Sequence, residues 1–431
     1  MVVLACFTGL SLSAQTGAGS AHTPYSVFGV GDVLHQGTAY HKAMGGTGIA
    51  SRNRKVINYM NPAALTARDS LSFMVDFSMM HADRIYRQQD MHGGANLTNL
   101  NDLVMSFPIY HHSAMMLGIA PYSGLGYQFS SYETDPYLIG NVGDITKTSA
   151  GTGSIYQIFA GAGVTLWRRL SLGAEYIHYF GNMSKATVVS YSQSGYNGVS
   201  SGYNLYLRGN TFKAGLQYEQ PIGSTTLAVG ATYKLAADLN GSVKDYKIST
   251  GSLVSDTLRN NINDFSKDKV SLAGELAVGV SLRGGERWRA ELDYTRSDWS
   301  DTGIDKVAGF ANTTGGVFTA TSSQFFRGGF EIVPNVKDVR YYMRRVSYKA
   351  GAYYGTEYFL LDGCQVRSAG LTVGITLPIS NQNTRMNNGL SVSVDIGQRG
   401  SLKSNLVRER YIGLTIGLNA FDIWFMKNQY Q

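Results

Sequence analysis

The chain has 431 residues, enough for two or three soluble domains, but its composition is not that of a soluble enzyme. Charged residues make up 16%, whereas soluble globular proteins carry about 25%. The formal net charge of +7 comes without a Lys- or Arg-rich tract, which argues against nucleic-acid binding. Past residue 14, no apolar run reaches the roughly 20 residues that a membrane-spanning helix needs. Together with 51 glycines and 28 tyrosines, these features favour a protein that crosses a membrane with strands.

The first fifteen residues have the pattern of a secretory signal, with an apolar stretch over residues 2–10 followed by small residues. We expect cleavage after Ala14. The residues before Cys6 also resemble a lipoprotein cleavage box, which is the alternative. Only Cys364 would then remain in the mature chain, so no internal disulfide is expected. The predicted division is a signal peptide at 1–14, an N-terminal arm and plug at 15–69, and a transmembrane β-barrel at 70–431.

A compact segment of small residues precedes the first alternating strand. It begins with Met44-Gly45-Gly46-Thr47-Gly48 and ends with Asn61-Pro62-Ala63-Ala64-Leu65, which carries an Asn-Pro turn signal. It does not recur in the chain. A non-strand segment placed directly before a series of membrane strands is typical of a plug inside a barrel.

From residue 70 onward, apolar and small or polar residues alternate with the period of two that β-strands require. Leu71, Phe73, Val75 and Phe77 begin the pattern, and it returns in about fourteen segments, an even number that suits a bacterial barrel. Long gaps at 131–152, 185–202 and 241–267 alternate with tight turns at 111–112 and 168–169. Tight periplasmic turns and long outer loops are typical of outer-membrane barrels, which would place both termini in the periplasm.

A Gly/Ala-rich segment that leads into Asn61, Pro62 and Ala63 and then into a barrel resembles the FadL-like (OMPP/TodX-type) family of outer-membrane transport proteins, in the style of its Bacteroidetes-type members. The resemblance implies an all-β fold: a transmembrane antiparallel β-barrel of about 14 strands with an N-terminal plug (hatch) in the lumen. It also implies passive uptake of hydrophobic, fatty-acid-like small molecules without a cofactor. Asn61, Pro62 and Ala63 would anchor the plug.

The third strand is interrupted at Pro121-Tyr122-Ser123-Gly124. Proline cannot donate to a ladder, so within a strand it marks an edge, a bulge or a bend. In the resembled family the third strand bends inward and opens a lateral hole in the wall, and these four residues match that position by strand count. The alternative is that the strand ends near Ala120 and a turn follows.

Charged side chains are predicted on the lumen side of several strands. The plug carries three cations, and strand parity turns five carboxylates inward. Ion pairs between the two groups would hold the plug, or the charges would only solvate a wet lumen. The predicted participants are Arg52, Arg54 and Lys55 on the plug and Asp76, Glu175, Glu275, Asp293 and Asp395 on the wall.

Enzyme signatures do not point to chemistry. The sequence contains no HExxH, GxSxG or paired CxxC motif, and Gly45-Gly46-Thr47-Gly48 lacks the GxGxxG spacing. A membrane-facing hydrolase would need a serine partner for His178, and none is apparent. We therefore predict no enzymatic activity, no catalytic or metal-binding residues and no cofactor.

Two functions fit these observations. The first is uptake of a hydrophobic small molecule or lipid, with exit sideways through the third strand into the bacterial outer membrane. The second is a FadL-like barrel that binds proteins in a surface-protein secretion or assembly system, with the loops at 131–152, 185–202 and 241–267 as its binding surface. A general hydrophilic porin is a third reading, against which a packed plug argues. Neither of the first two functions requires nucleic acid.

Overall fold

The structure is a computed structural model that describes residues 22–68, 72–110, 112–193, 195–250, 257–264, 269–307, 309–310, 317–338, 340–379, 388–403 and 406–423. The predicted signal peptide lies outside the described residues. No helix in these ranges is long and apolar enough to cross a membrane.

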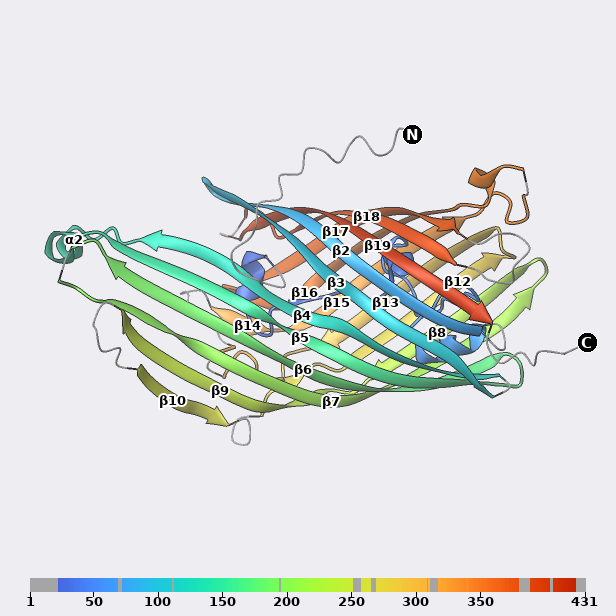
Figure 1. Cartoon of the computed structure of the whole chain (residues 1–431), viewed down its shortest axis with the longest axis horizontal. Helices are drawn as coiled ribbons and strands as arrows, with labels where there is room; N and C mark the ends of the chain where they lie inside the picture. The colour runs from blue at the N-terminus through green and yellow to red at the C-terminus, as the bar shows by residue number, and fades with distance from the viewer. Residues whose placement is uncertain are drawn as a thin grey trace, which may run out of the picture.

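The strands close into one antiparallel barrel of 14 strands, as the alternation predicted. Consecutive strands pair throughout, and β19 closes on β2 (Figure 1). Three barrel strands are interrupted and are made of β8 with β9, of β10 and β11 with β12, and of β14 with β15. The bounds are β2 (Ser72–Gln88), β3 (Met91–Tyr110), β4 (Ser113–Tyr132), β5 (Ile145–Leu166), β6 (Leu170–Tyr191), β7 (Gly198–Ile222), β8 (Thr225–Lys234), β9 (Ala237–Thr250), β10 (Thr257–Asp264), β11 (Ser271–Leu272), β12 (Glu275–Gly284), β13 (Trp288–Asp298), β14 (Phe318–Ala320), β15 (Ser322–Ile332), β16 (Ser347–Leu361), β17 (Cys364–Pro378), β18 (Gly389–Arg399) and β19 (Arg408–Ile423).

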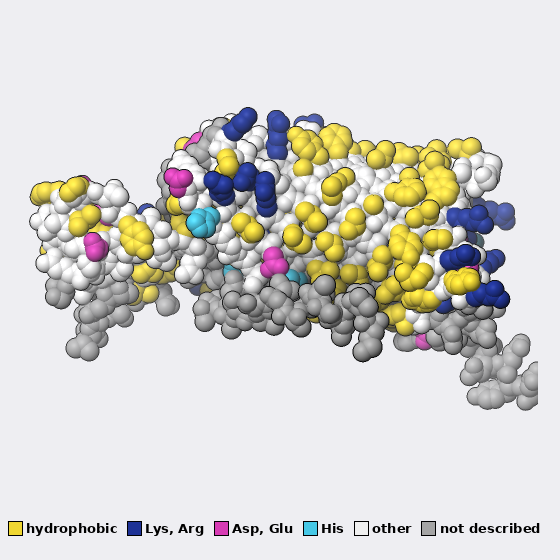
Figure 2. All heavy atoms as spheres, turned by 90° about the horizontal axis from the view of Figure 1, so that it is seen from above, with side chains coloured by type: hydrophobic (Ala, Val, Ile, Leu, Met, Phe, Trp, Pro, Cys, Tyr) yellow, Lys and Arg dark blue, Asp and Glu magenta, His cyan; other side chains and the backbone are white. Residues whose placement is uncertain are grey.

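The outer face of the wall is apolar because alternate residues of each strand point outward. Large apolar side chains are exposed there, whereas the inward neighbours are small, polar or charged and mostly buried. Figure 2 shows hydrophobic side chains across this face between groups of Lys and Arg. Outward residues include Phe77, Leu117, Phe212, Val278, Leu292, Phe326, Leu371, Ile396 and Ile412. A closed barrel with an apolar exterior is a protein of the bacterial outer membrane.

Strands extend well into the long gaps expected at 131–152, 185–202 and 241–267, which corrects the prediction of loops throughout them. β5 begins at Ile145, β6 continues to Tyr191 and β9 continues to Thr250. A ladder needs only paired backbone groups, so it continues where polar Ser and Thr replace the lipid-facing residues. These extended hairpins, with α2 (Pro136–Val142) at one tip, project from one end of the barrel (Figure 1). We call this the hairpin end and the opposite end, with the tight turns, the turn end.

The N-terminal segment, residues 22–68, is largely buried and lies inside the ring of strands. It contains η1 (Pro24–Val27), β1 (Asp32–Val33), α1 (Ala39–Lys42) and η2 (Pro62–Ala67). η2 packs against β5, β6 and β7, whereas α1 packs against β17, β18 and β19. The segment therefore reaches strands on opposite sides of the barrel.

The wall is incomplete between β3 and β4. Their ladder runs from Tyr110↔Ser113 only as far as Leu103↔Ile119. Beyond that point every residue of β4 from Ala120 to Tyr127 is buried, so the strand has left the outer surface and entered the interior. There β1 pairs with β4 instead, at Val33↔Ser123 and Asp32↔Gly124.

Candidate functional site: the barrel interior

The Asn61-Pro62-Ala63 turn lies against the inner wall at β5, β6 and β7. The Asn61 amide nitrogen donates to the Ile49 carbonyl (2.8 Å) and the Leu216 carbonyl (3.3 Å), while its oxygen accepts from the Ala63 N–H (3.0 Å). A Cβ at Gly173 would come within 2.3 Å of the Pro62 carbonyl carbon, and one at Gly215 within 2.2 Å of the Asn61 side-chain oxygen. Glycines in the wall thus provide the space in which this turn sits.

The same arrangement continues around the barrel. Other inward glycines leave too little room for a Cβ because the backbone or Cβ of the N-terminal segment lies against them. They are Gly163 against Pro62, Gly230 against Ile49, Gly329 and Gly351 against Met44, and Gly374 against Ala43. These contacts between wall glycines and the N-terminal segment were not predicted from the sequence. The signal for them was the glycine content at inward positions of the strands.

Arg52 is the plug cation most firmly held by the wall. Its side chain is 6% exposed and pairs with Glu219 at 2.9 Å, and one guanidinium nitrogen donates to Ser171 (2.9 Å) and Gln217 (3.1 Å). Glu219 was not among the five predicted partners. Lys55 pairs with Glu286 in a turn (3.6 Å), where both side chains are exposed, and Arg54 is also exposed.

Of the five predicted carboxylates, Asp293 binds the N-terminal segment directly. One of its oxygens accepts from the N–H groups of Gly48 (2.6 Å) and Ile49 (2.9 Å). This differs from the predicted ion pair, because the donors are backbone amides that side-chain patterns do not reveal. Glu175 pairs with Lys213 of the neighbouring strand at 2.6 Å, and Lys213 in turn donates to the Tyr59 carbonyl (3.0 Å).

The remaining three carboxylates are bound within the wall or line the cavity. Asp76 accepts from Asn419 (3.2 Å), and Asp395 accepts from the Tyr353 hydroxyl (2.9 Å). Glu275 lines the internal cavity beside Tyr122. The structure therefore places all five inside the barrel and pairs none of them with Arg52 or Lys55 among the described contacts.

Helix α1 is fixed by a buried polar cluster on β13, β15 and β16. Tyr40 donates its hydroxyl to Glu331, which also lies 3.8 Å from Lys349 and 4.0 Å from Arg289. Burial, with the positive charges of Arg289 and Lys349, lowers the pKa of His41 to about 3, so its imidazole is neutral. The His41 Nδ1 lies 2.9 Å from the Thr38 hydroxyl. Among the described residues no cluster suited to a metal ion is found.

A second charged cluster joins β1 to the first and last strands at the hairpin end. Asp32 pairs with Arg399 at 2.8 Å and with Arg84 at 3.4 Å, and Arg84 also pairs with Glu409 at 2.6 Å. Arg399 additionally contacts Glu357 at 3.0 Å. Each partner is nearly buried, so the attraction acts with little screening by water. This cluster was not predicted from the sequence, because Asp32 precedes any recognisable pattern.

The mouth at the hairpin end is closed by a hydrophobic cluster. The first part of the N-terminal segment, residues 22–34, is called the arm, and it contributes Tyr25, Val27 and Val30. The segment after β13 folds inward and adds Trp299 and Phe310. Lys185 ties the two together by donating to the carbonyls of Val27 (2.8 Å) and Phe310 (3.4 Å). Tyr127, Leu205, Leu207, Val243, Phe318, Tyr358 and Phe359 complete the cluster. Packed apolar side chains of the described residues thus lie across this end of the interior.

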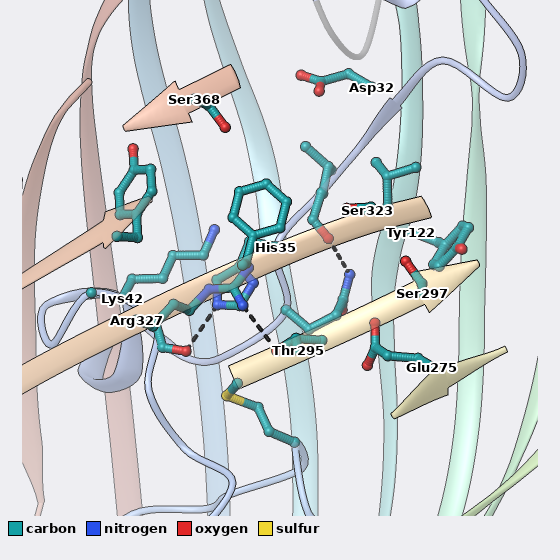
Figure 3. Close-up of a pocket in the computed structure, with 18 of the residues that line it drawn as sticks. Asp32, His35, Lys42, Tyr122, Glu275, Thr295, Ser297, Ser323, Arg327 and Ser368 are labelled. Atoms are coloured by element: carbon teal, nitrogen blue, oxygen red, sulfur yellow. Dashed lines mark hydrogen bonds between the residues drawn. The ribbon is translucent and has the colours of Figure 1, made fainter. Parts of the chain in front are cut away.

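The interior contains a cavity of about 280 Å³, with both apolar side chains and charged groups in its lining. Figure 3 shows His35, Lys42 and Arg327 around it, with Asp32 and Glu275 on other sides. His35 lies 2.9 Å from the Gly46 carbonyl, and Arg327 donates to Thr295 (3.0 Å). Most of the exposed lining is nevertheless apolar, and apolar ligands are usually bound in pockets of that kind.

The four residues singled out on the third strand lie at the start of the inward bend of β4. The register with β5 shifts between Pro121 and Ser123, as in a β-bulge. The Pro121 carbonyl accepts from Gln36 (3.1 Å), and the Tyr122 carbonyl from the Leu34 N–H (2.9 Å). The strand therefore continues through these residues rather than ending near Ala120, and the N-terminal segment covers its free edge.

A family model named BamG matches residues 1–431, the whole chain. The chain belongs to the BamG family. No curated protein matched this BamG-family chain.

Solved structures share the fold of this BamG-family chain at low sequence identity. The toluene transporter TbuX of Ralstonia pickettii is 16% identical with a TM-score of 0.60, over 90% of this chain and 98% of that one. The CymD monoaromatic hydrocarbon channel is 15% identical with a TM-score of 0.58, over 91% of this chain and 98% of that one. A Pseudomonas aeruginosa FadL homologue is 13% identical with a TM-score of 0.57, over 91% of this chain and 100% of that one. These likenesses confirm a FadL-type barrel fold. The Bacteroidetes-type affiliation stays a prediction.

Proposed function

We propose that the chain is a closed outer-membrane barrel that binds partner proteins, as a component of a surface-protein secretion or assembly system. The observation that carries this proposal is the interior. It is occupied by the chain's own N-terminal segment, a hydrophobic cluster of the described residues lies across its mouth, and charged groups occur in its cavity among apolar ones. A hydrophobic solute would have to displace these buried charges, whose partners would then be left unpaired at a cost of about 1–3 kcal/mol each.

The surface best suited to a protein partner is the tip of the β4–β5 hairpin. Tyr132 and Tyr137 are 73% and 77% exposed there, Leu138 is 41% exposed, and α2 buries none of its side chains. This tip projects from the hairpin end of the barrel (Figure 1), so we place it outside the lipid layer. Exposed aromatic side chains of this kind are enriched at protein interfaces.

The test is co-purification of a tagged chain from detergent-solubilised outer membranes. In the tip variant, Tyr132→Ser and Tyr137→Ser are combined, and we expect it to lose partners that the wild-type chain retains at a fixed ratio. Leu402→Ser is the matched control, because Leu402 is also exposed (43%) but lies in a different hairpin. Depletion of the chain should also lower the amount of other proteins at the cell surface. A chain that purifies alone, with no such effect on depletion, contradicts the proposal.

Uptake of a hydrophobic small molecule with lateral exit is the second candidate, and the inward bend of β4 supports it. Residues 121–124 would be the gate, because the wall lacks β3–β4 pairing beside them. Replacing them with Val-Thr-Val-Thr should favour regular pairing and close the wall. A transporter would lose uptake of a labelled monoaromatic or fatty acid, whereas a protein-binding barrel would keep its partners. Normal uptake by a folded, closed variant would exclude lateral exit.

A further inference from the structure

A groove of about 680 Å³ runs across the outer wall over β2 and β16–β19. Its floor is made of the small residues Ala352 and Ala369. Its sides are Ile85, Leu371, Ile396 and Ile412, which are 67%, 66%, 55% and 56% exposed. The register explains the shape, because Leu371, Ile396 and Ile412 lie opposite one another across three strands. The groove is therefore an apolar channel within the lipid-facing surface.

Cationic side chains border the groove toward the hairpin end. Arg410 lines it and donates to Gln398 (3.2 Å), and Ala369 is opposite Gln398 in the ladder. Two residues further along the outward faces, Arg408 is paired in register with Arg87. Arg367 follows Ala369 on the outward face of β17, toward the same end. Figure 2 looks onto this side of the molecule and shows groups of Lys and Arg next to the hydrophobic surface.

The end of the barrel at which these arginines lie determines which membrane leaflet they face. Tight turns face the periplasm in outer-membrane barrels, so the hairpin end is outside and the groove lies in the outer half of the apolar band. The opposing acid on this face, Asp83, is in the row of Ile412, one row closer to the membrane centre than Arg410. Asp83 itself lines the groove and lies 3.7 Å from His81 on the side away from the arginines.

We infer that this groove binds a phosphorylated glycolipid of the outer leaflet, with an acyl chain in the channel and the phosphate among Arg87, Arg367, Arg408 and Arg410. The apolar part matches an acyl chain because lipid is the solvent at this depth. The charged part matches an anionic head group, since each Lys or Arg near the interface contributes about 1 kcal/mol toward such lipids. This site is on the wall and does not depend on the function proposed for the interior.

Native mass spectrometry of the detergent-solubilised full chain tests the head-group contacts. The probes are monophosphoryl lipid A and the same lipid without phosphate. We expect the phosphorylated probe to bind at least about tenfold more tightly, and the double variant Arg408→Gln with Arg410→Gln to lose that preference. The control is Arg168→Gln with Arg169→Gln, which removes two cations from a turn at the opposite end. Equal binding of both probes, or equal binding by the two double variants, overturns the inference.

A second variant tests the acyl channel without changing charge. Ala369→Trp fills the floor of the groove from an exposed outward position, so the barrel ladder is unaffected. Binding of monophosphoryl lipid A should fall at least several-fold, while the unboiled protein keeps its folded mobility on a gel. If Ala369→Trp leaves lipid binding unchanged but releases a bound protein, the groove is a protein interface and the lipid assignment is wrong.

Discussion

Along the β5–β6 seam the ladder runs unbroken from Leu166↔Leu170 to Ile145↔Tyr191, whereas along the β3–β4 seam it stops at Leu103↔Ile119. The N-terminal segment meets both seams. At the first, Pro62 lies on a complete wall over Gly163 and Gly173. At the second, β1 supplies the backbone partners that β3 does not.

The difference follows from what a backbone needs inside a membrane protein. Every N–H and C=O group must be paired, because hydrocarbon offers no alternative partner. At β5–β6 the two strands pair each other's backbone groups. The N-terminal segment fits there because the wall has glycines, which lack side chains, beneath it. At β3–β4 the segment itself completes the hydrogen bonding of Tyr122, Ser123 and Gly124. We therefore expect the segment to be dispensable for one seam and structural for the other.

Cysteine pairs should show the largest contrast between the seams. In a Cys364→Ser background, Thr152→Cys with Ser184→Cys should crosslink almost completely, since these residues face each other across β5–β6. Ser123→Cys should crosslink with Val33→Cys, its partner in β1. It should not crosslink with Asn99→Cys, which would face it if the β3–β4 ladder continued. Non-reducing gels after oxidation measure the yields, and an efficient 99–123 bond would show that the seam is closed.

Removing the arm should have the next largest effect. Deletion of residues 22–34 removes β1 and the buried Tyr25, Val27 and Val30, so it exposes both the β4 edge and the mouth cluster. Each large buried side chain accounts for about 2–5 kcal/mol, so the unfolding free energy should fall by more than that of any single substitution. Urea titration followed by gel mobility provides the measurement. The control replaces α2 with a Gly-Ser linker. An equal loss of unfolding free energy in the deletion variant and in this control would contradict a structural role for β1.

A larger side chain at one of the wall glycines under the N-terminal segment should displace that segment without breaking the wall. A side chain at Gly173 would collide with the Pro62–Ala63 peptide, where a Cβ alone comes within 2.3–2.4 Å of backbone atoms. We expect Gly173→Leu to raise single-channel conductance and protease cleavage near Arg54 several-fold, because the segment leaves the lumen while β5–β6 stays paired. Ala174→Leu, on the exposed face of the same strand, should change neither property. Unaltered conductance in Gly173→Leu would mean that the segment does not restrict the lumen.

The smallest expected difference is between two cations of the N-terminal segment, Arg52 and Lys55. Arg52→Gln removes buried contacts with Glu219, Ser171 and Gln217, but Arg283 still pairs with Glu219 at 2.8 Å. The loss should be about 1–3 kcal/mol. Lys55→Gln breaks an exposed pair and should cost about 0–1 kcal/mol. Both values come from the same urea titration, and equal costs would show that the Arg52 contacts do not stabilise the segment.

Much of the barrel was predictable from the sequence because its signal is periodic. Alternation identified the strands from residue 72 onward, and strand parity turned Asp76, Glu175 and Asp293 inward correctly. Parity gives no height or position around the ring, so it did not identify Glu219 as the partner of Arg52. The proline rule identified the interruption at Pro121, since a missing donor is a property of the residue itself.

Other features depended on contacts between distant segments, which leave no local pattern. The seat of Asn61-Pro62-Ala63 is made by glycines more than 90 residues away, and nothing around them indicates what they face. The long hairpins were mistaken for loops because their outward residues are polar, and alternation of apolar residues was the criterion. The arm gave no signal for its cluster with Arg84 and Arg399, because Asp32 lies in a strand of two residues.

The contacts of the arm with β2 and β19 have a consequence for the order of assembly. Thr23 donates to Glu409 of the last strand (2.6 Å), and Asp32 reaches Arg84 of the first strand (3.4 Å). These groups meet only when β19 closes on β2 in the native register. A slip of one residue would turn Glu409 toward lipid and leave Arg84 without its 2.6 Å partner. The described N-terminal arm thus contacts both strands that close the barrel, and its contacts favour the one closure in which both are satisfied.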